Sequence, residues 1–146
     1  MGTTASAVSW RISTPEAAAA PAALSALRAQ VPAGFSLGYS TDWNAAGAMI
    51  AGADAWYSVL AGLFPGVCLE IARAIAEGDH ARARALDERL APLWQLFKSF
   101  SSLRVIYAAA NLIGLCDTAP PLPILPLADD ARRQVAEVLE RLGLTA

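Results

Sequence analysis

The sequence predicts an α/β fold in which short parallel strands alternate with helices and a helical region follows. Two apolar runs, residues 35–40 and 55–60, flank a segment of helical character at 43–51. Two buried strands joined by a helix form a βαβ unit, whose strands run parallel. Residues 7–13 alternate apolar and polar side chains, as a third strand would. From Pro65 onward the apolar residues recur at helical spacing.

Composition narrows the possible functions. A chain of 146 residues is expected to form one domain. It is 55% hydrophobic and 16% charged, with a mean hydropathy of +0.41, which indicates a large core or a face that needs a partner. The net charge of −2 gives no basic surface for nucleic acid. The start has no signal-peptide pattern and no apolar run reaches about 20 residues, so we expect a cytoplasmic protein that does not bind membranes.

Metal and cofactor chemistry have little support in the sequence. The chain has one histidine, His80, and two widely separated cysteines, Cys68 and Cys116. A zinc site requires more ligands at closer spacing, so we predict no metal, no cofactor and two buried, reduced thiols. Lys98 is the only lysine, and any chemistry of a lysine amine depends on it.

The first half of the chain contains signals for the ends of helices. Residues 14–16 (TPE) are typical of a helix start, and Pro21 is expected to break that helix and leave a cleaner one at 22–30. Asp42 is interpreted as the cap of the next helix, which Gly52 would end.

The second half is predicted to be helical except for one connector. Residues 65–77 carry one apolar stripe, and Gly78-Asp79 separates them from a long helix at 80–100. Residues 103–115 are apolar nearly all round and should be the most buried. Four prolines at 117–126 predict an extended connector. The final helix should run over 128–142, with Gly143 as its cap, and the charges at 87–89 and 129–130 should be solvated.

Six short motifs occur in a fixed order over about residues 8–144. They are GYSTD (38–42), AGADAWYSV (51–59), FP (64–65), EGDHARARAL (77–86), LAPL (90–93) and LPILPL (122–127). In this order they resemble the C-terminal part of the dihydrodipicolinate synthase / N-acetylneuraminate lyase family. Its members are pyruvate-dependent class I aldolases, which are lyases built on a (β/α)8 barrel with extra C-terminal helices.

The resemblance implies a partial barrel: about three C-terminal parallel strands with their helices in residues 1–65, and a C-terminal helical bundle of the same domain in 66–146. It places Gly38 and Ser40 at the rim of the substrate site. It places the Tyr57 carbonyl and the Ser58 region beside bound pyruvate or a related 2-oxo acid. It also implies a homo-oligomer, or a partner chain that completes the barrel.

One departure from the family pattern concerns the reactive lysine. In these aldolases a lysine at the end of the sixth strand forms a Schiff base with pyruvate, and the resemblance places Arg11 at that position. A guanidinium stays protonated and is a poor nucleophile, and Lys98 lies on a different element. We therefore expect a truncated family member that is inactive alone.

Several alternatives stay open from the residues. The chain could be a non-catalytic module that binds a small acid, with Arg11 pairing with a carboxylate, or one that binds a protein partner. It could also be a gene fragment without a function of its own. Tyr57 and Trp56 could be ordinary core aromatics, and Arg11 could be a strand-end arginine that reaches water.

Overall fold

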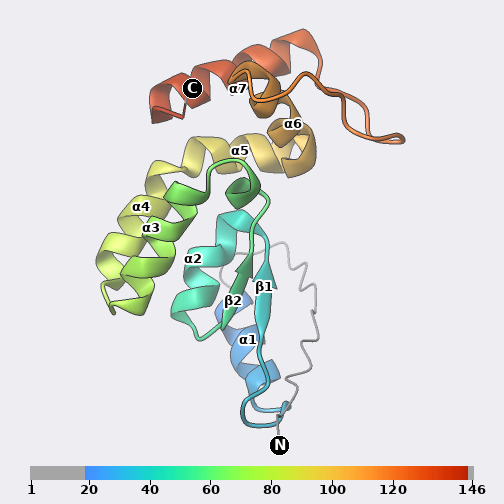
Figure 1. Cartoon of the computed structure of the whole chain (residues 1–146). Helices are drawn as coiled ribbons and strands as arrows, with labels where there is room; N and C mark the ends of the chain where they lie inside the picture. Colours follow the sequence, from blue (N-terminus) through green and yellow to red (C-terminus); the bar gives the residue numbers. More distant parts are fainter. Residues whose placement is uncertain (1–18, 145–146) are drawn as a thin grey trace, which may run out of the picture.

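The computed structural model describes residues 19–144 and gives the chain an α/β architecture. The predicted first strand at 7–13, Arg11 and the predicted helix start at 14–16 lie outside the described residues. Figure 1 shows the elements in order: α1 Ala19–Arg28, β1 Gly38–Ser40, α2 Asp42–Ile50, β2 Ala55–Tyr57, the 3-10 helix η1 Leu60–Gly62, α3 Pro65–Ala76, α4 His80–Arg89, α5 Ala91–Phe100, α6 Ser102–Leu112 and α7 Asp129–Leu142.

The two described strands form a parallel pair, which confirms the βαβ unit. Gly38 lies opposite Ala55 and Ser40 opposite Tyr57. α2 connects the strands and packs against both of them (Figure 1). Both strands are shorter than predicted. β2 ends at Tyr57 because the chain then turns into η1, and β1 begins only at Gly38.

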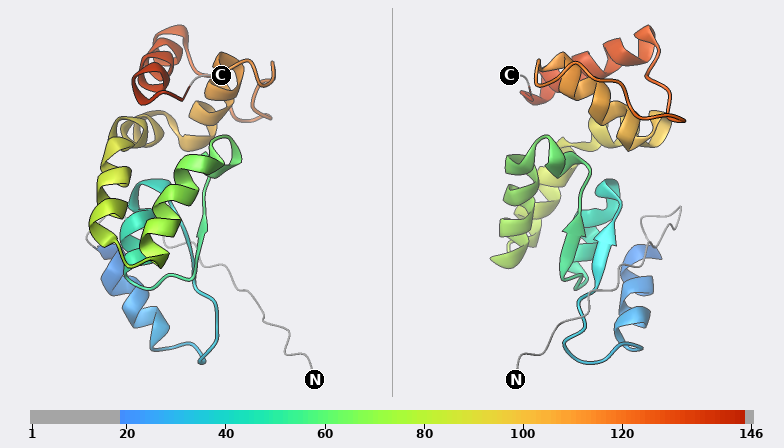
Figure 2. Two further views of the ribbon diagram at one scale, coloured as in Figure 1. Left: turned by 60° about the vertical axis from the view of Figure 1, so that its left-hand side comes forward. Right: turned by 45° about the vertical axis from the view of Figure 1, so that its right-hand side comes forward.

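Two apolar clusters form the core. The smaller one lies between the sheet and helices α1 and α2: Leu24, Leu37, Tyr39, Ala45, Ala48 and Ala53. The larger one joins α2 and η1 to the C-terminal helices: Ala46, Leu60, Cys68, Ile71, Leu90, Leu93, Trp94, Leu96, Phe97, Val105, Ala109, Val135 and Leu139. Figure 2 shows α3 and α4 side by side, with α5, α6 and α7 stacked beyond them. Because Ala46 and Leu60 belong to the larger cluster, the strand region and the helical region share one core.

Two prolines, Pro21 and Pro92, lie within segments predicted to be helical, and only Pro92 accompanies a break in the helix. Pro21 lies inside α1 and does not break it, since the first amide groups of a helix have no partner within the helix. Pro92, by contrast, accompanies a break: the predicted helix at 80–100 is two helices that meet at Leu90. Pro92 occupies the first turn of α5, where its missing N–H costs nothing.

Most of the predicted helix ends are confirmed. α3 begins at Pro65, and the Asp79 carboxylate caps α4 by accepting a hydrogen bond from the Arg82 amide at 3.0 Å. Gly143 ends α7 in the left-handed conformation, with φ of 68°. His80 at the start of α4 is exposed.

The predictions of burial for α6 and its surroundings are wrong. α6 ends at Leu112, and Leu115 beyond it is 67% exposed. Fewer large side chains are buried on α6 than on α5, because one flank of α6 faces the connector and solvent. Cys116 is exposed, although Cys68 is buried as predicted. Asp87 is half-buried and accepts a hydrogen bond from Trp94 Nε1 at 3.0 Å, so it is not simply a solvated charge.

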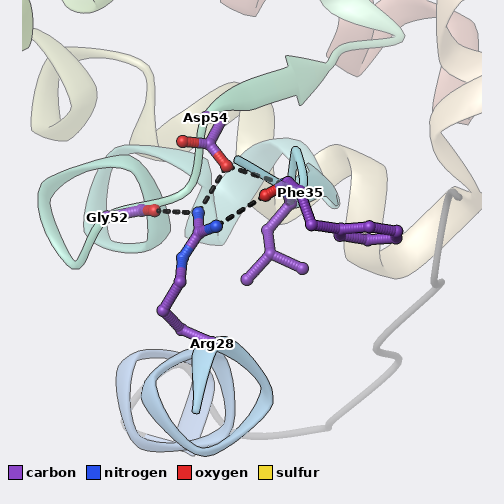
Figure 3. Close-up of polar contacts among 5 residues, drawn as sticks. Arg28, Phe35, Gly52 and Asp54 are labelled. Carbon is purple, nitrogen blue, oxygen red and sulfur yellow. Dashed lines mark hydrogen bonds and ion pairs between the residues drawn. The ribbon is translucent and has the colours of Figure 1, made fainter. Parts of the chain in front are cut away.

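An arginine ties α1 to the base of the sheet (Figure 3). Arg28 donates to the carbonyl of Phe35 at 2.6 Å and to that of Gly52 at 3.2 Å, and it forms an ion pair with Asp54. Asp54 also accepts a hydrogen bond from the Leu37 amide at 2.7 Å. That amide, and secondly Arg28, hold the pKa of Asp54 below its usual value. These contacts lie where β1 and β2 begin, at the opposite end of the strands from Ser40, Tyr57 and Ser58.

Candidate functional site

The four predicted site residues within the described region lie together on the sheet. Gly38 and Ser40 belong to β1, Tyr57 ends β2, and Ser58 follows it. Because β1 and β2 are parallel and Ser40 pairs with Tyr57, both strands end at the same edge. Alternation along the strands places Gly38, Ser40 and Tyr57 on one face of the sheet, opposite to buried Tyr39.

On that face the Tyr57 ring covers Gly38. A Cβ atom at Gly38 would lie 2.1 Å from Tyr57 Cε2, so any larger residue would displace the ring. Tyr57 is 46% exposed, and its interpretation as an ordinary core aromatic is therefore wrong. Trp56 points to the other face, where it is partly buried against both clusters.

Asp42 is a buried anchor and not the cap of its own helix. It is 3% exposed, and the residue that precedes α2 is Thr41, which makes no side-chain capping bond. The carboxylate of Asp42 accepts hydrogen bonds from Trp56 Nε1 at 3.0 Å, the Val59 amide at 3.1 Å and the Leu60 amide at 3.2 Å. It therefore fixes the segment that follows β2, because it caps η1 from another element.

This anchor explains why β2 ends early. The amides of Val59 and Leu60 donate to Asp42, so they are not available to continue a strand ladder. Thr41 turns the chain from β1 into α2 with a φ of 143°, in a region that a β-branched residue rarely adopts. Such strain costs on the order of 1–3 kcal/mol and is commonly found beside functional sites.

Burial controls the charge of the Asp42 carboxyl. Burial raises its pKa, and hydrogen bonds from Ser58, Leu60, Trp56 and Val59 oppose this in part. The hydrogen bonds from Trp56, Val59 and Leu60 tie this buried carboxyl to the segment that follows β2. Asp42 therefore acts as a positioning residue for the Ser58 segment.

Ser58 and Cys68 form a polar contact beneath this segment. Ser58 Oγ accepts a hydrogen bond from the Ala61 amide at 2.9 Å and lies 3.6 Å from Cys68 Sγ. Burial raises the pKa of Cys68 to about 11, with a smaller contribution from the negative charge of Asp42. The thiol is therefore protonated at neutral pH and is a poor nucleophile.

An apolar groove of about 340 Å³ lies beside the same residues, between β2 and α3. Trp56, Ser58, Cys68 and Leu69 are among its lining residues. Leu69 is 48% exposed there, so the groove leaves a large apolar side chain in contact with water.

The only lysine lies on the helical side of this region. Lys98 is in the last turn of α5, and its Nζ is 5.8 Å from the centroid of the Trp43 ring. Within residues 19–144 no cluster of three or more acidic, histidine or cysteine side chains could hold a metal ion. Over the same residues, the helices are too short or too polar to cross a membrane.

Comparison with known proteins shows what the chain is related to. A sequence model of the Dihydrodipicolinate synthetase family matches residues 16–142. The chain belongs to this family. Among solved structures, dihydrodipicolinate synthase from Agrobacterium tumefaciens superposes with a TM-score of 0.85 and 44% identity, over 93% of this chain and 45% of that one.

Curated relatives of this dihydrodipicolinate synthetase family member likewise match it over only part of their own length. The 4-hydroxy-tetrahydrodipicolinate synthase of Parvibaculum lavamentivorans is 32% identical over 88% of this chain and 44% of its own length. That of Gluconacetobacter diazotrophicus is 34% identical over 66% of this chain and 32% of its own length. The chain thus spans less than half the length of these relatives. The predicted family membership is confirmed.

Two features of the site were not predicted from sequence. Asp42 was expected to be a cap because an acidic residue at a helix start usually is one, and no local pattern identified the distant amides that it binds. The contact between Ser58 and Cys68 likewise depends on how α3 packs against β2.

Proposed function

We propose that this chain is the C-terminal portion of a dihydrodipicolinate synthase-like (β/α)8 barrel and that it does not catalyse a pyruvate-dependent aldolase reaction alone. The supporting observation is the edge where β1 and β2 end, which carries Ser40, Tyr57 and Ser58 but has no lysine among the described residues. In barrels of this class, catalytic groups collect at the C-terminal ends of the strands.

The proposed reaction chemistry requires a neutral amine. Schiff-base formation needs an amine that can lose its proton, attack the carbonyl carbon of the 2-oxo acid and then release water. By resemblance the matching position is Arg11, whose guanidinium stays protonated. What this chain contributes is the wall of the substrate site: the Tyr57 carbonyl and Ser58 beside a 2-oxo acid, with Gly38 and Ser40 at the rim.

The fixed position of that wall supports this role. Asp42 holds the amides of Val59 and Leu60, so the preceding Tyr57 and Ser58 have a defined backbone path. Such preorganisation lets a wall present polar groups to a ligand without reordering.

We further propose that the free edge of β2 pairs with a strand from a homo-oligomer partner or from a chain that completes the barrel. The Asp54 amide donates to the Leu37 carbonyl at 2.8 Å, toward β1. Because amides alternate sides along a strand, those of Ala55 and Tyr57 point away from β1. No strand within residues 19–144 pairs with this edge of β2, and an unpaired edge beside an apolar groove favours strand addition.

Borohydride trapping tests the catalytic proposal. We expect no covalent adduct after incubation with pyruvate and borohydride, as judged by intact-protein mass spectrometry. An adduct on Lys98 that disappears in the Lys98→Arg variant would overturn the proposal. A full-length dihydrodipicolinate synthase serves as the positive control for the trapping conditions.

Sedimentation velocity tests the pairing proposal separately. We expect the sedimentation coefficient to rise with protein concentration, and the Leu69→Asp variant to weaken this dependence because it places a charge in the groove. The Leu122→Asp variant is the matched control, since Leu122 is 84% exposed on the distant connector. A sharp monomer at all concentrations would contradict pairing.

A further inference from the structure

A second cavity lies between α6, the proline-rich connector (residues 113–128) and the start of α7, and its lining residues come much later in the sequence than β1 and β2. Its volume is about 150 Å³. The polar side chains on its wall are Arg104, Tyr107, Asn111, Asp117, Thr118 and Arg132. Neither the family resemblance nor the proposed barrel site uses any of these residues.

The walls of this cavity are held by hydrogen bonds to backbone. Arg104 donates from Nε to the Leu125 carbonyl and from Nη2 to the Pro126 carbonyl, both at 2.8 Å. Asn111 donates from Nδ2 to the Cys116 carbonyl at 2.8 Å and to the Thr118 carbonyl at 3.2 Å. Both ends of the proline-rich connector are thus fixed to α6, and the cavity between them is a built feature.

The charge of the wall is positive on balance. Arg104 and Arg132 both line the cavity, and neither forms an ion pair with another described residue. Asp117, on the exposed connector, is the one acidic side chain on the wall. Asp129 and Asp130 lie in the first turn of α7 but do not line the cavity.

Arg132 has hydrogen-bond donors available for a ligand. Within residues 19–144 it donates one hydrogen bond, a long one from Nη1 to Asn111 Oδ1 at 3.5 Å. A guanidinium has five N–H donors, and two of them can bind one carboxylate or phosphate group side by side. Arg132 is also half-buried, so an anion beside it would be partly shielded from water.

We propose that this cavity binds one small anion bearing a carboxylate or phosphate group. Arg132 supplies the paired hydrogen bonds, Arg104 adds positive charge, and Tyr107 offers a hydroxyl from the wall. The volume of about 150 Å³ suits an ion of the size of phosphate or a short dicarboxylate. Because the wall comes from α6, the connector and α7, bound anion joins these segments and stabilises the folded chain.

Titration with two anions tests this site and shows whether it prefers a phosphate or a carboxylate group. Phosphate and succinate are added to the full chain at constant ionic strength with chloride as the filler, and binding is followed by calorimetry and by the thermal midpoint. We expect one of the two to bind at one site per chain and to raise the midpoint in proportion to the logarithm of its concentration. If neither binds more strongly than chloride, the proposal is wrong.

Two adjacent arginines supply a matched comparison. Arg132→Gln should weaken anion binding by tenfold or more, whereas Arg133→Gln should leave it within twofold. Both remove one positive charge from the same turn of α7, but Arg133 is exposed and does not line the cavity. Equal weakening by the two variants would show only a general charge effect and would overturn the site.

An NMR titration of the unmodified chain tests the site even if a variant fails to fold. Amide chemical shifts in residues 104–111, 117–119 and 127–132 should move on titration, while those beside Ser40 and Tyr57 stay unchanged. Shifts confined to other regions would overturn the proposal. Since the strand ends are not involved, this result does not depend on the outcome of the borohydride experiment.

Discussion

Replacing Asp42 by alanine should destabilise the chain strongly, because three N–H donors lose their acceptor at once. The donors are Trp56 Nε1 and the amides of Val59 and Leu60, at 3.0–3.2 Å from the carboxylate. A buried donor left unsatisfied costs about 1–3 kcal/mol. Trp56 Nε1 and the Val59 amide are only partly buried, so water can accept some of their hydrogen bonds in the variant. The alanine variant also no longer has to bury a carboxyl group, and this reduces the destabilisation by about 1 kcal/mol.

The net cost is therefore about 3 kcal/mol, a large share of the roughly 5–15 kcal/mol by which domains are stable. It should lower the thermal midpoint by about 6–12 °C. Urea unfolding followed by far-UV circular dichroism measures the change. Glu137→Ala, at an exposed position on α7, is the control and should change the free energy of unfolding by less than about 0.5 kcal/mol. If Asp42→Ala costs no more than this control, the anchor has been misinterpreted.

The pH dependence gives an independent check on Asp42. Burial raises its pKa in the folded state. Because the folded state holds this proton more tightly than the unfolded state, the group adds its full contribution to stability below its pKa in the unfolded chain. That contribution is lost as pH rises through its pKa in the folded chain. Asp42→Asn does not titrate, so the difference in free energy of unfolding between the natural chain and this variant should shrink as pH rises over that window. A difference that grows with pH would contradict the assigned direction.

Three further predictions concern other parts of the chain. Cys116 should react rapidly with a thiol reagent in the folded protein while Cys68, buried and with a pKa of about 11, reacts only after unfolding; equal rates would contradict this. Gly38→Ala should displace the Tyr57 ring at a cost of about 1 kcal/mol, and the cost should vanish in a Tyr57→Ala background, as a double-mutant cycle would measure. Asp79→Ala should lower the free energy of unfolding by about 1 kcal/mol through loss of the α4 cap, which chemical denaturation would detect.

Features encoded by neighbouring residues were predictable from the sequence. The start of α3 at Pro65 and the end of α7 at Gly143 follow from the backbone preferences of single residues. The parallel pairing of β1 and β2 follows from the βαβ pattern. The positions of Ser40 and Tyr57 at one edge follow from that pairing.

Features that depend on distant contacts were not predictable in the same way. Asp42 satisfies the local rule for a cap, yet its carboxylate binds amides that come later in the chain. α6 has the composition of a buried helix, but its burial depends on which neighbours cover it, and the connector leaves Leu112 and Leu115 exposed. A helical period likewise continues through Leu90, where the chain bends.

The Tyr57 ring over Gly38 has a consequence for any chain that completes the barrel. In the barrel that we propose, the ring lies on the sheet face that lines the interior, where it covers Gly38 and is 46% exposed. Side chains of the strand that we propose to pair with β2 would compete with the Tyr57 ring for that space, and rotation about the side-chain bonds of Tyr57 would move the ring away. Pairing of the proposed partner strand with β2 and displacement of the Tyr57 ring from Gly38 would then occur together.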